Sequence, residues 1–404
     1  MNVLTCKSSR ALAIVLPAVM LTAACGSGSD SGAASGGAAK PYVVRGLVDL
    51  TGVLGTTFSP ANNGAQAYFR MLNESGGVAG HQIDYKAIDG TSTADGGFAA
   101  VQQAISAKPV AVLQLTGSST FLRVQPALTS ATIPLLTVVS TDSYVYPPRP
   151  YLYQTIMTTK QQAQAVVAKT IEVIGGSLSG KQVAMVGDVT PVVDAVTKNV
   201  EQLVEAAGGH MGKAQTVAIG TPSFTSQAST IVSSHPDAVI SLATGNDTVT
   251  MGTALTTAGL SAPIVSWNAG SSPAVFQKIA SAKYYADTEV VYPSTDPTYS
   301  DVAKKYGASD SDLSSQWFSI GWVQAALIAG GLSHCTNTCT STTLNTALEQ
   351  LNNFQVPNGA AFGPATFSST SHAAMTSAQF YTWNASTKAI VKSGNPVNLG
   401  ASAG

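Results

Sequence analysis

Two cysteines near the carboxyl end of the chain have the spacing of a small covalent or metal-binding site. Cys335 and Cys339 lie four positions apart, directly after His334. In an oxidising compartment they would form a disulfide, and so short a loop would chiefly fix a local turn. Zinc is the alternative, with His334 as a third ligand, but no second CxxC or HxxxH group completes such a site. We therefore predict a disulfide and no metal site.

Another cysteine, Cys25, stands between an apolar run and a stretch of small residues. Lys7 and Arg10 precede the apolar run 11–21, which is shorter than the roughly 20 residues of a membrane-spanning helix. A basic flank, a short apolar core and small residues are typical of a secretory signal peptide. The sequence LTAAC at its end resembles the bacterial lipobox, and this resemblance implies a lipid on Cys25. An ordinary signal peptide with an incidental cysteine is the alternative.

These segments predict where the protein works. We expect a lipoprotein signal peptide over 1–24, followed by a flexible tether of mostly Gly, Ser and Ala over 25–40. The protein would then be exported across the bacterial cytoplasmic membrane and lipid-anchored to its outer face, in the cell envelope. An exported protein meets oxidising conditions, which favours the disulfide between Cys335 and Cys339 over zinc.

Catalytic motifs are missing from the sequence. It contains no G-x-S-x-G elbow, no G-x-x-x-x-G-K-[ST] loop and no strand-placed G-x-G-x-x-G. No carboxylate pair follows a predicted strand end in the way that acid–base catalysis needs. The histidines are scattered without HExxH spacing, at His81, His210, His235, His334 and His372. We expect a binding protein without a cofactor rather than an enzyme, and a hydrolase on an α/β fold is the alternative.

Composition limits the class of protein further. About 360 residues follow position 40, which exceeds one usual domain and suggests two lobes. Charged residues make up 10% of the chain and the net charge is −1, so no basic surface for nucleic acid is expected. Hydrophobic residues make up 45%, which is ample for two cores.

Strand-like and helix-like segments alternate along the chain. Several of the strand-like segments are nearly continuous apolar runs, as in parallel sheets that are buried on both faces. Repeated βα units predict doubly wound parallel sheets, and the repetition suggests two of them. The main predicted strands are 42–50, 81–89, 110–117 and 133–140, and then 181–188, 214–220, 237–245 and 262–270.

The order and spacing of several motifs resemble those of the type I periplasmic binding proteins. The likeness is greater to the branched-chain amino-acid-binding branch, which serves ABC importers. It covers about residues 42–395 and is carried by these segments: LNESGGVAGHQIDYKAID, LTGSSTFLRVQPAL, IPLLTVVSTDS, LYQTIMTTKQQAQAVV, AGLSAPIVSWNAG and FGPATF. The resemblance implies an α/β fold with two doubly wound parallel-sheet lobes joined by a three-stranded hinge.

The same resemblance implies how the chain divides between the lobes. It places the hinge crossings near 155–158, 291–294 and 364–367. The amino-terminal lobe would comprise 42–155 and 292–365, and the carboxyl-terminal lobe 157–290 and 367–400. A ligand would lie between the lobes, outside the carboxyl ends of the strands.

The first lobe is expected to supply most of the ligand contacts. The group Gly117, Ser118 and Ser119 follows an apolar strand and opens a helix, where free N–H groups attract anions. These serines could instead only cap the helix. By resemblance, Val139 would offer backbone groups and Thr141 a hydroxyl group. The other predicted contacts of this lobe are Ser140, Thr57 and Phe58.

The second lobe is expected to supply Thr244 and Asn268, at positions where the family usually has an aromatic and an acidic residue. Asp188 and Asp247 lie beside other strand ends and could reach the ligand, although such residues often only cap helices. Trp317, at the start of a predicted helix, is interpreted as a core residue rather than a lid over the ligand.

The predicted function is therefore that of an extracytoplasmic solute-binding lipoprotein of an ABC importer. Its partners would be a small-molecule ligand, the permease and the membrane, with no nucleic acid, and the protein would be a monomer. Because Asn268 carries no charge, a small polar or carboxylate-bearing ligand is expected rather than a branched-chain amino acid. A ligand-sensing receptor without a transport role is a further alternative.

Overall fold

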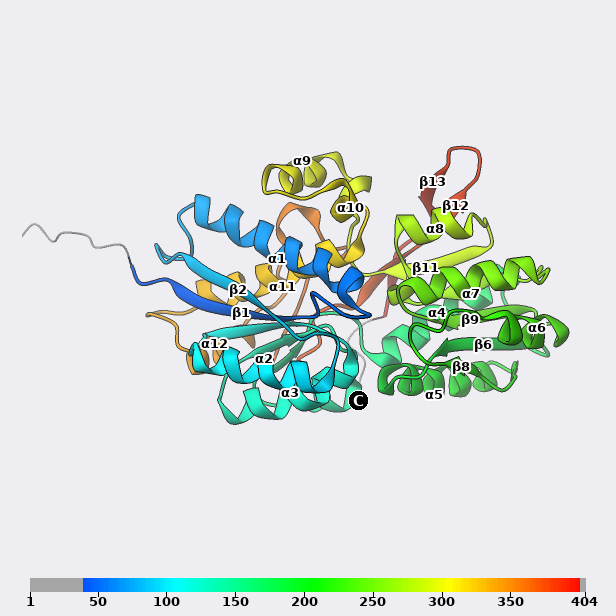
Figure 1. Cartoon of the computed structure of the whole chain (residues 1–404), viewed down its shortest axis with the longest axis horizontal. Helices are drawn as coiled ribbons and strands as arrows, with labels where there is room; N and C mark the ends of the chain where they lie inside the picture. Colours follow the sequence, from blue (N-terminus) through cyan, green and yellow to red (C-terminus); the bar gives the residue numbers. More distant parts are fainter. Residues whose placement is uncertain (1–38, 400–404) are drawn as a thin grey trace, which may run out of the picture. The chain divides into compact units, whose positions relative to one another are not determined.

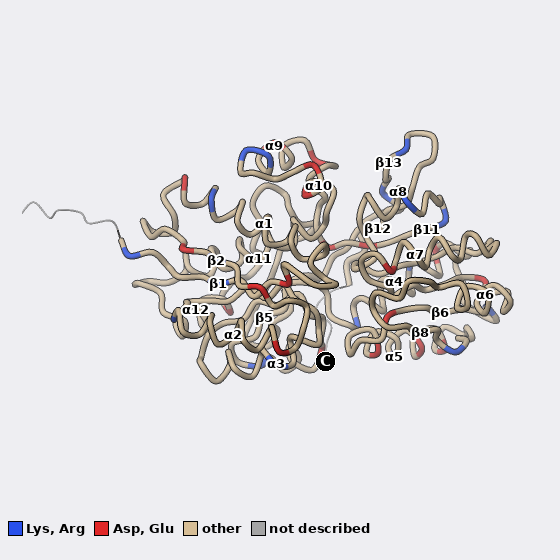
Figure 2. Tube along the Cα trace, viewed as in Figure 1, with Lys and Arg blue, Asp and Glu red and all other residues tan. Residues whose placement is uncertain are grey.

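The computed structural model describes residues 39–399. The predicted signal peptide, the lipidation of Cys25 and nearly all of the predicted tether lie outside this range. Within it the chain forms two parallel-sheet lobes, each with helices on both faces of its sheet (Figure 1), as the sequence predicted. None of the described helices is long and apolar enough to cross a membrane. Charged residues of both signs are spread over both lobes (Figure 2).

The first lobe is built on a five-stranded parallel sheet in the order β2-β1-β3-β4-β5. Alternate residues of each strand face opposite sides, so Val44 and Val48 join one core cluster while Leu47 joins the other. Both faces are buried, which explains the almost uninterrupted apolar runs. The strands are β1 (Tyr42–Val48), β2 (Ile83–Asp89), β3 (Ala111–Leu115), β4 (Leu135–Thr137) and β5 (Leu152–Gln154).

Helices cover the two faces of this sheet as separate pairs, α2 and α3 on one face and α1 and α11 on the other (Figure 1). The helix α11 comes from a distant part of the sequence. The helices of this lobe are α1 (Gly55–Glu74), α2 (Ala94–Ser106), α3 (Ser118–Ser130), α9 (Pro297–Lys305), α10 (Asp310–Leu313), α11 (Gln316–Ser333) and α12 (Ser341–Leu348).

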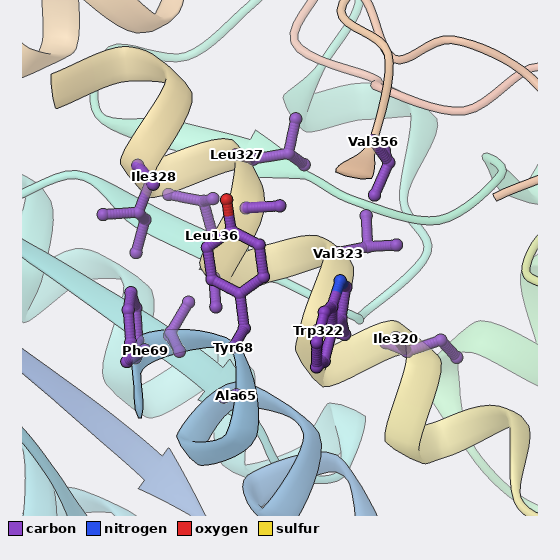
Figure 3. Close-up of a cluster of buried hydrophobic side chains, with 14 of the residues drawn as sticks. Ala65, Tyr68, Phe69, Leu136, Ile320, Trp322, Val323, Leu327, Ile328 and Val356 are labelled. Carbon is purple, nitrogen blue, oxygen red and sulfur yellow. The ribbon is translucent and has the colours of Figure 1, made fainter. Parts of the chain in front are cut away.

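The crossing of α1 and α11 is the tightest contact of the first lobe. At Gly64 an added Cβ would lie 1.8 Å from the carbonyl oxygen of Phe318, and at Gly321 it would lie 1.8 Å from that of Ala61. Only glycine permits this approach of two backbones. Around the crossing, Tyr68 of α1 packs edge-on against Trp322 of α11, and both are buried (Figure 3).

The second lobe is built on a nine-stranded sheet that runs β13-β12-β11-β10-β9-β6-β7, with β8 also paired to β6 and β14 to β12. The strands β12, β13 and β14 pair antiparallel, and the others parallel. The strands are β6 (Gln182–Asp188), β7 (His210–Met211), β8 (Gln215–Val217), β9 (Ala238–Leu242), β10 (Ile264–Ser266), β11 (Tyr284–Thr288), β12 (Ser377–Asn384), β13 (Ala389–Lys392) and β14 (Val397–Asn398).

Helices again divide between the two faces of this sheet. Val166 and Val200 belong to the core cluster on one face, whereas Ile231 and Leu255 belong to that on the other. The helices are α4 (Thr159–Val173), α5 (Pro191–Ala206), α6 (Thr225–Ser233), α7 (Asn246–Thr257) and α8 (Pro273–Ile279). Four short 3₁₀ turns lie in the loops of the two lobes: Asp142–Tyr144, Asn268–Gly270, Pro293–Thr295 and Pro357–Gly359.

Three segments of the chain cross between the lobes side by side. The N–H of Gln154 donates to the carbonyl of His372 at 2.8 Å, and the N–H of Met157 donates to the Oε1 atom of Glu289 at 3.0 Å. The third crossing differs from the expected position of 364–367. Phe367, Ala374 and Met375 still pack into the core of the first lobe, and the second sheet resumes only at β12. The third crossing comes later because Ala373 first forms a parallel bridge with Gln154, at the end of β5.

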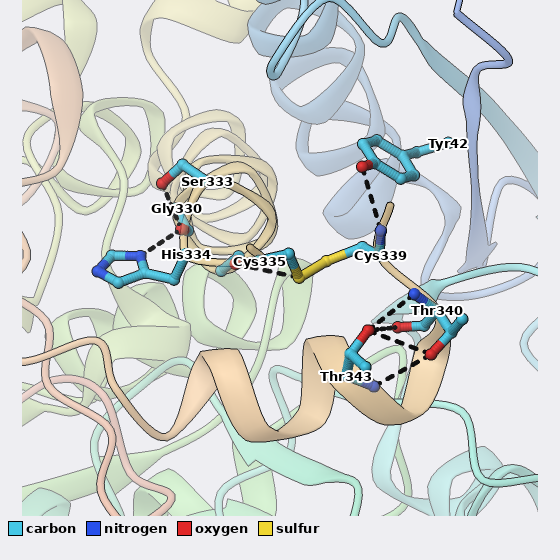
Figure 4. Close-up of a disulfide and its surroundings, with 9 residues drawn as sticks. Tyr42, Gly330, Ser333, His334, Cys335, Cys339, Thr340 and Thr343 are labelled. Carbon is cyan, nitrogen blue, oxygen red and sulfur yellow. Dashed lines mark hydrogen bonds between the residues drawn. A yellow bond between two sulfur atoms is a disulfide. The ribbon is translucent and has the colours of Figure 1, made fainter. Parts of the chain in front are cut away.

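The structure joins Cys335 and Cys339 by a disulfide at the end of α11, with 5.8 Å between their Cα atoms (Figure 4). The N–H of Cys339 donates to the hydroxyl of Tyr42 at 3.2 Å, which ties the loop to the start of β1. The imidazole Nδ1 of His334 lies 2.9 Å from the carbonyl oxygen of Gly330, within its own helix. No cluster of three potential metal ligands occurs among residues 39–399.

Joint replacement of Cys335 and Cys339 by serine is expected to lower the free energy of unfolding by at most about 2 kcal/mol, because the closed loop is so short. Ligand affinity should not change, since neither residue lines a pocket between the lobes. Thermal melts and calorimetry on the oxidised protein and the variant test both points. A large loss of affinity in a folded variant would contradict this expectation.

Candidate functional site

A small cavity lies between the carboxyl ends of the two sheets, and we call it the central cavity. Its volume is about 90 Å³, below the roughly 300 Å³ at the small end of usual ligand sites. It is lined by Leu54, Phe58, Thr116, Gly117, Ser118, Val138, Val139, Ser140, Ile156, Gln162, Thr190, Val192, Ile219, Thr244, Trp267, Asn268, Ala269 and Trp317.

The topology of the sheets explains the position of this cavity. In the first sheet β1 lies between β2 and β3, so the connections that leave β1 and β3 run to opposite faces and open a crevice. In the second sheet β6 and β9 are neighbours, and the connections that leave them also run to opposite faces. The loops after these four strands therefore supply much of the cavity wall, and they include Gly117, Thr190 and Thr244.

The amino terminus of α3 presents hydrogen-bond donors to the central cavity. Gly117 is the N-cap residue, and its own N–H donates to the Oδ2 atom of Asp49 at 3.1 Å. The backbone N–H groups of Ser118 and Ser119 have no acceptor within the described part of the chain, and no side chain caps this helix. Free N–H groups at a helix amino terminus suit a carboxylate or another anion. Ser118 lines the cavity, whereas the exposed Ser119 side chain does not.

The segment after β4 forms the neighbouring part of the wall. The N–H of Val139 is used internally, since it donates to Thr137 Oγ1 at 2.9 Å. The hydroxyl of Ser140 donates to the carbonyl of Met157 at 2.7 Å, so its oxygen can still accept a hydrogen bond. Thr141 lies further out, where its N–H donates to Gln154 Oε1 at 2.7 Å. Val139 and Ser140 line the central cavity and Thr141 lines only the adjoining pocket described below.

Aromatic side chains supply most of the apolar wall. Phe58 and Trp317 pack edge-on with their ring centroids 4.9 Å apart, held by the crossing of α1 and α11. Trp317, which the sequence suggested as a core residue, is half-buried and lines the cavity. From the second lobe, Trp267 lines the cavity, and its indole N–H donates to the carbonyl of Ala243 at 3.0 Å. Such rings suit the flat or apolar body of a ligand.

Side-chain amides and a buried carboxyl group form the opposite wall. Asn268 and Gln162 line the cavity, and the Nδ2 and Nε2 atoms of their amides donate to Glu289 at 2.8–3.2 Å. Glu289 lies directly after β11 in the hinge and is fully buried. Desolvation raises its pKa, while hydrogen bonds from Met157, Asn268 and Gln162 act to lower it. Sequence reasoning missed both Glu289 and Gln162.

A pair of carboxyl groups supports the second-lobe loops from behind. Asp188 and Asp247 are buried, and the Oδ2 atom of Asp188 accepts the N–H of Thr244 at 2.7 Å. Burial, and then the charge of Asp247, raise the pKa of Asp188 to about 7. Neither aspartate lines the cavity, so Asp188 is not brought to the ligand position that the sequence suggested. Its role in the structure is to hold the loop that carries Thr244.

This pair predicts a pH dependence of stability. A carboxyl group whose pKa is raised on folding binds its proton more tightly in the folded state, so its contribution is lost as pH rises from about 4 to about 7. Asp188→Asn keeps an acceptor for Thr244 and needs no proton. It should therefore stabilise the protein at pH 8 relative to the wild type, by up to about 4 kcal/mol, and by much less at pH 4.5. Urea unfolding at both pH values measures the difference.

The control for this prediction is Asp194→Asn, on the exposed face of α5. It should leave the pH dependence of unfolding as in the wild type. If Asp188→Asn destabilises the protein equally at both pH values, the pair does not share a proton in the folded state and the assignment is wrong.

The two lobes touch on either side of the central cavity. A methyl group added at Gly245, whose φ is +58°, would lie 3.2 Å from Oγ1 of Thr57. The Nε2 atom of Gln316 donates to the backbone carbonyl of Asn268. Thr57 therefore lies at the rim, outside the central cavity, and its neighbour Phe58 lies inside.

Wider pockets adjoin the central cavity on both sides. One, of about 540 Å³, is lined by Lys160 and Lys198 together with Asp142, and shares Ser118 and Ser140 with the central cavity. The other, of about 640 Å³, shares Trp317 with it; its charged lining residues are Lys278 and Asp312. Among residues 39–399, no charged side chain lines the central cavity itself.

Comparison with known proteins agrees with this arrangement. The sequence model of a family described as periplasmic binding protein matches residues 44–389. A branched-chain amino acid ABC transporter protein from Thermus thermophilus with bound valine shares the fold, with a TM-score of 0.79 and 16% identity over 89% of this chain and 96% of that one. None of the curated proteins compared matches the sequence.

Two further solved structures show the same fold with other ligands in their descriptions. A solute-binding protein from R. palustris in complex with 4-hydroxybenzoate has a TM-score of 0.76 and 18% identity, over 89% of this chain and 97% of that one. A fatty acid ABC transporter substrate-binding protein from Thermomonospora curvata has a TM-score of 0.76 and 17% identity, over 89% and 92%. The family match extends over most of the chain, and the chain belongs to the type I periplasmic binding protein family.

Proposed function

We propose that the protein is the solute-binding component of an ABC importer, and that it takes a small ligand with a carboxylate but without an α-ammonium group. The carboxylate would accept the free N–H groups at the amino terminus of α3, near Ser118. The body of the ligand would lie between Phe58, Trp267 and Trp317. The amide wall would contact its other end.

One observation carries the ligand class: no charged side chain of the described chain lines the central cavity. An amino acid would bring both a carboxylate and an ammonium group into this cavity. Its ammonium group would lack an ionised partner in direct contact, and an unpaired buried charge costs roughly 3–5 kcal/mol. A ligand without that group avoids this cost.

The adjoining pockets leave room for a ligand that is longer than the central cavity. The central cavity alone is smaller than a usual ligand site, and a ligand would extend past Ser118 and Ser140 into the pocket that contains Lys160 and Lys198. The solved relatives, described with valine, 4-hydroxybenzoate or fatty acid, indicate that this fold accommodates ligands of quite different sizes.

Calorimetry with two groups of compounds tests the proposed ligand class. The first contains leucine, isoleucine and valine, and the second contains small aromatic and aliphatic carboxylates. We expect binding within the second group and none tighter than micromolar in the first. Sub-micromolar binding of any of the three amino acids would overturn the proposal. Turnover of a bound compound would instead support an enzyme.

We also propose that Cys25 is lipidated and begins the mature protein. An anchored protein would stay beside its permease, because one diacylated cysteine carries two acyl chains and suffices for stable attachment. Mass spectrometry of the amino-terminal peptide from cell envelopes should find Cys25 with lipid. An unmodified amino terminus beyond Cys25 would refute the anchor while leaving the ligand site unaffected.

A further inference from the structure

Glu289 is the meeting point of three N–H donors that come from different parts of the fold. Its Oε1 atom accepts the backbone N–H of Met157 at 3.0 Å and the Nε2 atom of Gln162 at 2.8 Å. The Nδ2 atom of Asn268 lies 3.0 Å from Oε1 and 3.2 Å from Oε2. The carboxyl group is fully buried and forms no salt bridge. Its hydrogen bonds therefore hold a hinge crossing and the cavity wall together.

These contacts fix which atom of each amide faces the carboxylate. An ionised carboxylate accepts hydrogen bonds and cannot donate, so it selects the NH₂ end of both amides. Rotating either amide would place its oxygen against the carboxylate. The amide oxygens of Gln162 and Asn268 are thus turned away from Glu289, in two side chains that line the central cavity.

Neither amide oxygen has a hydrogen-bond donor among residues 39–399. Gln162 is almost fully buried and its Oε1 atom has no hydrogen-bond partner. The Oδ1 atom of Asn268 likewise accepts no hydrogen bond from the described residues. A buried acceptor left without a donor costs free energy, so a ligand that supplies the donor gains relative to one that does not.

The charge state of Glu289 is related to that of Asp287, two residues earlier in β11. Asp287 is also fully buried, and neither of its oxygens has a partner. Burial, with a further contribution from the charge of Glu289, raises the pKa of Asp287 well above its ordinary value. Three N–H donors favour the ionised form of Glu289, whereas no donor to the Asp287 carboxyl group offsets its burial, so the negative charge is favoured on Glu289 rather than on Asp287.

We propose that Glu289 determines specificity by positioning: it turns the amide oxygens of Gln162 and Asn268 away from itself at the wall of the central cavity, so that the preferred ligand carries a neutral hydrogen-bond donor, a hydroxyl or an amide N–H, opposite its carboxylate. This inference rests on the proposed carboxylate site at α3 and adds the chemistry of the other end. Glu289 itself does not line the cavity and acts through Gln162 and Asn268.

The experiment compares matched ligands by calorimetry on the full mature protein. One series is benzoate, 4-hydroxybenzoate, 4-methoxybenzoate and 4-(aminomethyl)benzoate, and an aliphatic series is butyrate with the same substituents at C4. The hydroxyl compounds can donate a hydrogen bond and the methoxy compounds cannot, although both carry the oxygen atom at the same position. We expect the hydroxyl compound to bind at least about tenfold tighter than the methoxy compound in whichever series binds.

Three variants separate positioning from hinge stability. Glu289→Gln offers one NH₂ group to the amides, which lets one of them rotate, and the preference for hydroxyl over methoxy should fall below about threefold. Asp287→Asn is the matched control, an equally buried carboxyl group two residues earlier in the chain without contact to the wall, and it should keep the full preference. Gln162→Met removes one oxygen, leaves the bond of Met157 to Glu289 intact, and should lose part of the preference.

Each of the following results would contradict one part of the proposal. Equal or tighter binding of the methoxy compounds by the wild type refutes the inference and leaves the carboxylate site standing. The same loss of preference in Asp287→Asn shows a general effect of the hinge and also refutes it. Tighter binding of the aminomethyl than of the hydroxyl compounds refutes the neutral donor. If no carboxylate of either series binds, the proposed function fails first, and this inference with it.

Discussion

Alanine at position 321 is expected to lower the free energy of unfolding by about 3 kcal/mol. The added Cβ would lie 1.8 Å from the carbonyl oxygen of Ala61, and backbone atoms cannot turn aside as a side chain can. The helices α1 and α11 would have to separate along their crossing. Because Phe58 and Trp317 sit on these two helices, the aromatic wall of the central cavity should widen as well.

The matched control is Gly331→Ala in the same helix. Its added Cβ would lie 2.8 Å from a methyl group of Leu348, which can shift. Alanine also favours helix over glycine by roughly 1 kcal/mol, so this variant should be close to neutral. Urea unfolding of the two variants gives the comparison. Equal stability of Gly321→Ala and Gly331→Ala would show that the two helices are further apart than described.

Replacing Asn268 by aspartate is expected to cost roughly 3–5 kcal/mol of stability at pH 8, because it sets a second carboxylate against Glu289 where a donor stood. The loss should shrink at pH 5, where the pair can hold a proton. The single variant is therefore a poor route to amino-acid binding. In the double variant Asn268→Asp, Glu289→Gln, the roles of donor and acceptor are exchanged and stability should return to within about 1 kcal/mol of the wild type.

The double variant should also bind leucine, isoleucine or valine about 10²–10⁴-fold more tightly than the wild type, since a carboxylate would then line the cavity for the ammonium group. Glu289→Gln alone is the control and should not gain affinity for these amino acids. Calorimetry at pH 8 compares the variants. If the double variant unfolds as readily as Asn268→Asp, the interaction between positions 268 and 289 is not the one described.

Much of the architecture could be predicted because it is local in the sequence. Apolar runs of four to eight residues between helical segments gave the parallel strands, and turn residues gave their ends. The loops after β3 and β4, where the sequence predicts ligand contacts, line the central cavity, since strand ends of a doubly wound sheet converge. The placement of the third hinge crossing was not predictable in this way, because the bridge of 373 to Gln154 joins segments that are far apart in sequence.

The missing part of the site depends on such long-range contacts. Glu289 is a single acidic residue after a strand, and its sequence context gives no hint that three donors will surround it. Gln162 reads as one more polar residue of a helix. Asp188 looked available for a ligand, whereas its partner is the backbone of Thr244 in the next strand connection. These residues are distinguished by the contacts that they make after folding, and such long-range contacts cannot be read from a single sequence.

The crossing of α1 and α11 also bears on the order in which the chain can fold. Gly64 and Gly321 lie roughly 250 residues apart, so the apolar face of α1 has no partner until nearly the whole chain has emerged during synthesis. The second lobe's stretch between the first two hinge crossings emerges complete well before then. A nascent chain that stops after β5 would expose Tyr68 and Phe69 to aggregation. Folding of the first lobe therefore waits on the carboxyl-terminal third of the protein.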